Sequence, residues 1–319
     1  MKRVVVLAAA MAVAAPVWSQ EYPTKPITII SAFAPGGTSD FVGRLLMQKV
    51  SENTGWKYVL ETKPGANGHI GTEYAAKAAP DGYTLCLGPS STHSINPALF
   101  KNLKYDVARD FAPLTPIAKV ANVLAVNPSD PSNNVKELIA FAKKNPGKLA
   151  FASAGTGTSI HLSGEIFKQA AGIDLLHVPF KGSAPATTSV IGGQVQILFE
   201  NLSAAISHIK GGRLKALAVT SKERQPLLPD VPTLQESGLP GFEVVAWFAM
   251  FAPSATPKPI QAKLNAEMVK ALNSPDVQEQ LRSRSMTPAP MTQEQFAVFW
   301  KDQREMFAKA VAAANIKLD

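Results

Sequence analysis

The chain has 319 residues, of which 46% are hydrophobic, and a formal net charge of +8. This composition excludes a disordered chain, and the length is sufficient for two packed lobes. The basic residues are dispersed, with no run of Lys and Arg interleaved with aromatic residues, so we expect small anions as partners and no nucleic acid.

The first 20 residues have the pattern of a secretory signal peptide. Lys2 and Arg3 precede an apolar run over residues 4–15, and small residues follow at a spacing typical of cleavage. We expect cleavage after Ser19 or Gln20. No later apolar run is long enough to predict a transmembrane helix. The sequence therefore predicts an exported protein.

The first half of the mature chain alternates short apolar runs with helical patterns. The order strand, helix, strand, helix, strand predicts a parallel sheet with helices on both faces. The single cysteine, Cys86, lies in the apolar run YTLCLG, which suits a small buried hydrophobe better than a catalytic thiol. The predicted elements are a strand at 27–34, a helix at 40–55, a strand and turn at 57–71, a helix at 72–82, and a strand at 83–88 that runs into a polar loop.

A second unit with the same order of elements follows. It contains a strand at 122–128, a helix at 134–148, and a strand, loop and helix at 149–172, and the alternation continues to residue 221. The tail from about residue 253 reads as helices. We therefore predict lobe one from residues 21–122 plus 248–319 and lobe two from residues 123–247, each an α/β lobe with a mainly parallel sheet. Ligands of such sheets bind beyond the carboxyl ends of the strands, which predicts a site in the cleft between the lobes.

The loop FAPGGTSD stands between the first strand and the first helix. Gly36 and Gly37 have no Cβ, so a ligand can approach the backbone closely. The amides that begin the helix have no internal partner and favour an anion, and Thr38 and Ser39 add hydroxyl groups. Asp40 is expected to be a helix N-cap rather than a ligand contact.

Similar polar loops follow the other predicted strands. Asn67 suits a left-handed turn and a ligand contact equally well, and His93 is expected to be a structural hydrogen-bonding residue. The loop SAGTGTSI has Ile160 at the third position of GxGxxG, which argues against a dinucleotide. Besides the four residues of the first loop, the candidate ligand-binding residues are Ala66, Asn67, Ser90, Ser91, Thr92, His93, Gly155, Thr156, Gly157, Thr158, Ser159, Lys181, Glu200 and Asn201.

Catalytic and metal-binding patterns are absent from the sequence. The five histidines form no HExxH or other metal-ligand spacing, and neither GxSxG nor a P-loop occurs. We therefore expect no catalytic residues, no metal and no cofactor. An exported serine hydrolase that uses Ser90 with His93 remains an alternative.

Several segments resemble the Bug family, the TctC-like periplasmic receptors of tripartite tricarboxylate transporters. The resemblance covers essentially the whole mature chain and rests on YPTKPITIISAFAPGGTSDFVGRLL, KPGANGHIGTEYAAKAAPDGYTL, STHSINPALFKNLKYDVARDFAPLTPIA, FASAGTGTSIHLSGEIFKQAAGIDLLHVPFKGSAPA and PTLQESGLPGFEVVAWFAMFAPSATP.

The resemblance implies a periplasmic receptor with a Venus-flytrap fold. Such a receptor captures an organic carboxylate and delivers it to a membrane permease; we expect a monomer. Di- and tricarboxylates, acidic amino acids and aromatic carboxylates all fit, and a sensory receptor for a membrane signalling protein is the alternative. Glu200 stands where the family commonly has Asp, and Trp247 and Phe248 suit either a ligand wall or packing between the lobes.

Overall fold

A computed structural model describes residues 22–313, so the predicted signal peptide lies outside the described residues. A sheet of ten strands runs through the molecule in the order β2-β1-β3-β9-β4-β7-β5-β6, and β8 and β10 also pair with β4. The strands are β1 (Ile27–Ser31), β2 (Tyr58–Thr62), β3 (Thr84–Pro89), β4 (Phe111–Val126), β5 (Ala150–Ser153), β6 (Leu176–Pro179), β7 (Ile197–Asn201), β8 (Lys215–Val219), β9 (Val245–Pro253) and β10 (Met286–Pro288).

Helices cover both faces of this sheet because side chains alternate along each strand. Ile29 belongs to one apolar cluster and the adjacent Ile30 to the other. The first cluster also takes residues from α1 (Thr38–Thr54), α7 (Ser183–Ile191), α8 (Leu202–Lys210), α9 (Lys258–Leu272) and α10 (Pro275–Arg282). The second takes residues from α2 (His69–Ala76), α4 (Val107–Asp110), α5 (Val135–Lys144), α6 (Ser159–Ala171) and α11 (Gln293–Ala313), and Cys86 is buried in it.

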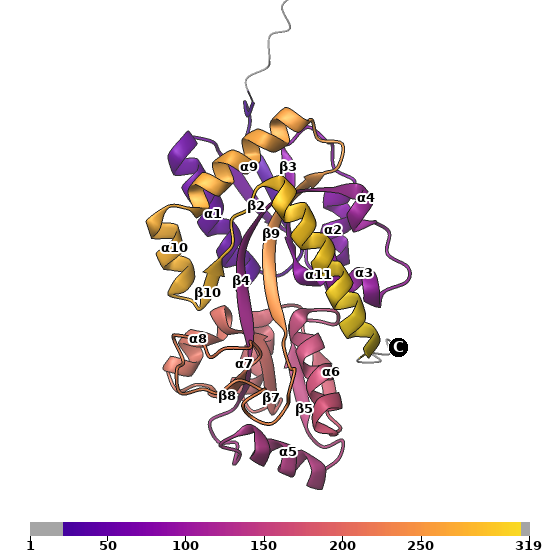
Figure 1. Cartoon of the computed structure of the whole chain (residues 1–319), viewed down its shortest axis with the longest axis vertical. Coiled ribbons are helices and arrows are strands. Elements are labelled where there is room, and N and C mark those ends of the chain that lie inside the picture. Colours follow the sequence, from indigo (N-terminus) through magenta and orange to yellow (C-terminus); the bar gives the residue numbers. More distant parts are fainter. Residues whose placement is uncertain (1–21, 314–319) are drawn as a thin grey trace, which may run out of the picture.

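The molecule has two lobes, which Figure 1 shows one above the other, joined by β4 and β9. In the first lobe β1 pairs in parallel with both β2 and β3, and in the second β5 pairs in parallel with β6 and β7. The remaining pairings, which all involve β4 or β9, are antiparallel. The predicted parallel α/β order is confirmed, and antiparallel strands are added between its two halves.

Strand β4 is longer than the sequence pattern indicated. The predicted strand at 122–128 corresponds only to its last part, which pairs with β7 and β8, whereas its first part pairs with β9. Pro113 and Pro116 lie in that first part, next to two register shifts in the pairing with β9. Proline removes a ladder hydrogen bond and is tolerated at bulges, so a segment that reads as irregular forms a strand here.

The region Ser90–Ser94 also differs from the prediction of a polar loop. It forms a turn of π-helix over Ser91–Ile95, followed by the short helix α3 (Asn96–Leu99). The segment Ala66–Gly68 forms a 3-10 turn in which Asn67 has a left-handed φ of 57°, the turn conformation considered for it. No helix within residues 22–313 is long and apolar enough to cross a membrane.

We expect Gly164→Ala to destabilise the protein. A Cβ at position 164 would come within 2.3 Å of the ring of Phe151, which is fully buried and packs against Phe199 and His177. The ring has little room to move, so overpacking outweighs the gain in helix propensity, with a net loss on the order of 2 kcal/mol. Urea unfolding measures the change, with the exposed Glu279→Ala as control; equal midpoints for both variants would contradict it.

Candidate ligand-binding site

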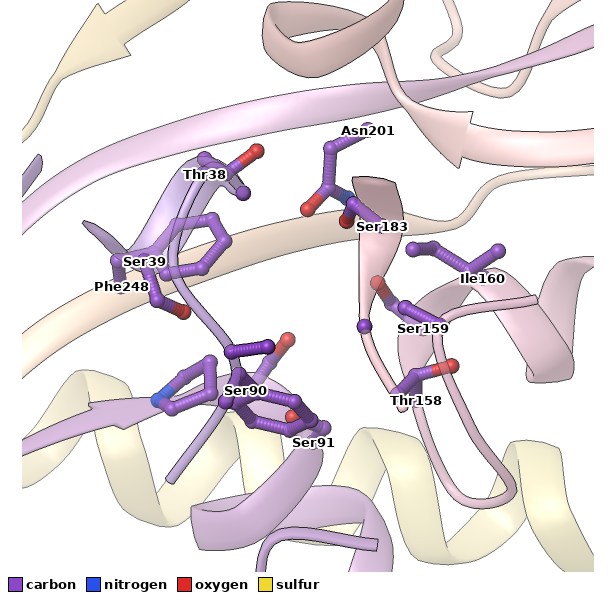
Figure 2. Close-up of a pocket in the computed structure, with 16 residues that line it drawn as sticks. Thr38, Ser39, Ser90, Ser91, Thr158, Ser159, Ile160, Ser183, Asn201 and Phe248 are labelled. Atoms are coloured by element: carbon purple, nitrogen blue, oxygen red, sulfur yellow. The ribbon is translucent and has the colours of Figure 1, made fainter. Parts of the chain in front are cut away.

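A cavity lies between the two lobes and holds about 450 Å³ of empty space, which includes open solvent at its mouth. Figure 2 shows the labelled side chains on its walls, from both lobes. The first lobe contributes residues from the ends of β1 and β3, the start of α1, and β9: Phe33, Ala34, Gly37, Thr38, Ser39, Pro89, Ser90, Ser91 and Phe248. The second lobe contributes residues from the end of β5, the starts of α6 and α7, and the end of β7: Ala154, Thr158, Ser159, Ile160, Gly182, Ser183 and Asn201.

Four helices begin at this cavity. Their N-cap residues are Gly37 for α1, Thr158 for α6, Gly182 for α7 and Asn201 for α8, and all four line the cavity. Within residues 22–313, Thr158 alone among these caps has a side chain that accepts a hydrogen bond from its own helix. The first amides of a helix lack internal partners and carry the positive end of the helix dipole, so the cavity favours negative charge.

The cavity contains no charged side chain, since all its lining residues are neutral. Within residues 22–313 no hydrogen bond joins the backbone amides of Thr38, Ser39 or Ser159 to another residue. The hydroxyl of Ser90 is buried and has no partner among the described residues. These groups offer hydrogen bonds without net charge, which suits an anion held by neutral donors.

Asp40 acts differently from the prediction. The N-cap of α1 is Gly37, so the expectation that Asp40 occupies this position was wrong. Asp40 lies three residues later, where its carboxylate accepts a hydrogen bond from the Gly36 amide at 3.3 Å and pairs with Arg44 at 2.9 Å. It therefore stabilises the loop before the helix, as the acidic residue of a capping box does, and does not line the cavity.

His93 packs in the core rather than on the cavity wall. Its ring is fully buried and stacks on Phe251 with centroids 4.1 Å apart, and Nδ1 bonds to the Thr92 hydroxyl at 2.8 Å. Burial lowers its pKa to about 3, so it is a weak base. No hydrogen bond joins Ser90 to His93 within the described residues. A hydrolytic pair needs such contact, so this geometry does not support Ser90 as a nucleophile.

A second pocket adjoins the cavity. It holds about 600 Å³ of empty space, open solvent included, and shares Phe33 and Ala154 with the cavity wall. Ala66, Asn67, Gly155 and Lys181, four of the predicted site residues, line it. Lys181 thus lies beside the cavity, one residue before the N-cap of α7, and lines the second pocket instead of the cavity.

Glu200 lies directly behind the cavity wall. It is fully buried, and its Oε1 accepts hydrogen bonds from Ser183 Oγ at 2.9 Å and from the Asn201 amide at 2.8 Å. Its Oε2 is buried without a partner among the described residues. Burial raises the pKa of Glu200 to about 7, although these two hydrogen bonds oppose the shift. Glu200 therefore contacts two lining residues without lining the cavity itself.

The predicted site residues are thus only partly brought together. Thr156, Gly157, Thr92 and His93 line neither pocket, and Gly36 lines a separate groove between α1 and α8. Sequence reasoning missed Ser183 because Lys181, two residues earlier, was the more obvious candidate in HVPFKGS. The cavity residues that were predicted are Gly37, Thr38, Ser39, Ser90, Ser91, Thr158, Ser159 and Asn201.

Two α/β lobes with a cavity between their strand ends define the periplasmic-binding-protein fold, the fold of BugD. The sequence model of the TctC family, described as "Tripartite tricarboxylate transporter family receptor", matches residues 42–316. The chain belongs to this family. The predicted Bug-type, TctC-like membership and two-lobed fold are therefore confirmed.

Three solved structures are closely similar. The periplasmic binding protein BugD is 36% identical with a TM-score of 0.88, covering 93% of this chain and 99% of BugD. Rpa4515 from R. palustris, solved with adipate, is 33% identical with a TM-score of 0.90, covering 93% of this chain and 99% of Rpa4515. MatC from Rhodopseudomonas palustris, solved with bound malate, is 32% identical with a TM-score of 0.87, covering 91% of this chain and all of MatC (100%).

The burial of Glu200 predicts a pH dependence of stability. Its pKa is raised from 4.5 to about 7 in the folded state, so folding retains a proton that the unfolded chain has lost between these values. The resulting stability is fully present below about pH 4.5 and is lost as pH rises through about 7. Between about pH 5 and 8 the wild type should lose on the order of 2 kcal/mol relative to Glu200→Gln.

Urea unfolding of both proteins at the two pH values measures this difference. The exposed Glu279→Gln is the matched control and should keep the pH dependence of the wild type. Parallel pH profiles for the wild type and Glu200→Gln would show that Glu200 does not titrate in this range.

Proposed function

We propose that the protein is an extracytoplasmic solute-binding receptor that captures a small organic carboxylate in the cavity between its lobes. The convergence of four helix starts on a cavity with no charged lining residue is the observation that carries this proposal. Free amides and the positive ends of helix dipoles stabilise an anion without a buried cation. The family membership and the carboxylates in MatC and Rpa4515 support the same class of ligand.

The lobes hold the ligand from opposite sides. We propose that they meet within β4 between Ala121, which pairs with β9, and Asn122, which pairs with β7, and again near Val245 where β9 begins. A carboxylate that contacts both lobes favours the arrangement in which they are close. A hydrogen bond between Thr38 Oγ1 and Ser203 Oγ, 2.7 Å long, already joins the lobes beside the cavity.

The wider role follows from the family. We propose that the chain is exported to the periplasm by its predicted signal peptide and acts there as a monomer. It then delivers its ligand to the permease subunits of a tripartite tricarboxylate transporter, and it binds without catalysis. The family description and the neutral hydroxyl and amide lining support this role. A thermal-shift screen over a panel of carboxylates identifies ligands, because binding raises the apparent stability.

Gly37→Val should abolish carboxylate binding while the protein still folds. A Cβ at position 37 would lie 3.4 Å from Ser183 Oγ across the cavity, and the two methyl groups of valine would fill the space beside the helix amides. Because the carboxylate could no longer come close to the first amides of α1, binding should weaken by a hundredfold or more, about 3 kcal/mol. Calorimetry with the best ligand of the screen measures it.

Gly192→Val is the matched control. Gly192 lies at the opposite end of α7, has an ordinary φ of −79°, and lies outside the cavity wall. This variant should keep wild-type affinity. Unchanged affinity in a folded Gly37→Val protein would exclude the start of α1 as the carboxylate site.

A further inference from the structure

We infer that the wall formed by Ser183 and Asn201 accepts hydrogen bonds, so that the ligand is a carboxylate that also carries a donor group, a hydroxyl or an ammonium. The inference rests on the proposed function and specifies its ligand class. It depends on the direction of the hydrogen bonds behind this wall. A backbone carbonyl fixes this direction at Asn201, and Oε1 of Glu200 fixes it at Ser183.

The direction at Asn201 is set by a chain of buried hydrogen bonds that ends on a backbone carbonyl. Ser163 Oγ donates its proton to the Ser159 carbonyl oxygen at 2.9 Å, so it can only accept from Asn122 Nδ2, also at 2.9 Å. The Asn122 side chain therefore presents its oxygen to Asn201, whose Nδ2 donates to it.

The side-chain oxygen of Asn201 is consequently the atom left for the cavity. Figure 2 shows this oxygen on the side of Asn201 that faces Thr38, inside the cavity. No hydrogen bond reaches it from another residue within 22–313. The Asn201 amide group is thus an acceptor toward the ligand.

Glu200 sets the direction at Ser183. An ionised carboxylate only accepts hydrogen bonds. Oε1 of Glu200 accepts one from the Ser183 hydroxyl and one from the Asn201 backbone amide. A proton on the carboxyl group would be favoured on Oε2, which has no partner within the described residues. Ser183 has one hydroxyl proton and it is engaged, so its oxygen faces the cavity as an acceptor.

The two acceptors discriminate between ligands. The Ser183 hydroxyl and the Asn201 backbone amide both donate to Oε1 of Glu200, so the two residues are neighbours on the cavity wall and one ligand group is expected to meet both of their side chains. A bare carboxylate or methylene at this wall leaves two acceptors unpaired, and a second carboxylate there is repelled. A hydroxyl or ammonium satisfies them, and the penalty for leaving buried polar groups unpaired makes such discrimination strong. Glu200 is a positioning residue, because it acts on the ligand through Ser183.

Calorimetry with matched ligand sets tests the inference. The sets are succinate, malate and aspartate; glutarate, 2-hydroxyglutarate and glutamate; and 3-phenylpropanoate, 3-phenyllactate and phenylalanine. In the set that binds best, the hydroxy or amino compound should bind at least about tenfold tighter than the parent acid. Ser183→Ala should reduce that ratio about fivefold or more, because it removes one of the two acceptors.

Three variants accompany this measurement. Glu200→Gln keeps a side-chain oxygen that accepts from Ser183 and should keep the preference, whereas Glu200→Leu frees the Ser183 proton and should lose it. Ser207→Ala changes an exposed serine of α8 outside the cavity and should match the wild type. Thermal unfolding shows that each variant is folded.

The outcomes separate this inference from the proposed function. If parent acids bind as tightly as their hydroxy and amino derivatives, or if Ser183→Ala weakens all three members of a set equally, the inference is wrong while carboxylate binding stands. If no member of these sets and no other carboxylate of the screening panel binds, the proposed function is wrong and the inference falls with it.

Discussion

The antiparallel pair of β4 and β9 is the constraint on which the site depends. β4 pairs with β9 in the first lobe and with β7 in the second, so both lobes are fixed to one continuous strand. The carboxyl ends of β3 and β7, at Pro89 and Asn201, consequently meet at one cavity. Helices that follow parallel strands begin at these ends, and their first amides are brought together by the topology alone.

This arrangement explains why the cavity has no cation. Removing a charged side chain from water is costly, whereas the amides at a helix start are already without internal partners. Four such starts supply positive potential without a buried arginine or lysine. Glu200, a buried acid, lies behind the wall, where it accepts a hydrogen bond from Ser183 and does not line the cavity. The negative charge in the cavity is therefore left to the ligand.

Features that depend on short stretches of sequence could be predicted from the sequence alone. The glycine-rich loop at Gly36 and Gly37 and the alternation of apolar runs identified both parallel units and the cavity residues at the start of α1 and α6. The sequence could not predict the first half of β4, because its prolines suit an irregular segment and its pairing with β9 spans more than a hundred residues. Ser183 was missed because Lys181 was the more obvious candidate in its loop, and the hydrogen bond from Ser183 to Glu200 appears only in the folded chain.

We propose that the ligand controls how closely the two lobes approach each other. The Thr38 and Ser203 hydroxyls share a hydrogen bond across the lobes, and Gln169 donates another to the Ala313 carbonyl. Each such neutral bond contributes only about 1 kcal/mol net of competition from water. A ligand that bonds to the start of α1 on one side and to Ser183 and Asn201 on the other adds several contacts that exist only when the lobes are close. In the proposed function, the difference between the ligand's affinities for the open and the closed arrangement of the lobes determines the equilibrium between them. The hydrogen-bond acceptors of the Ser183 wall decide which carboxylates favour the closed arrangement.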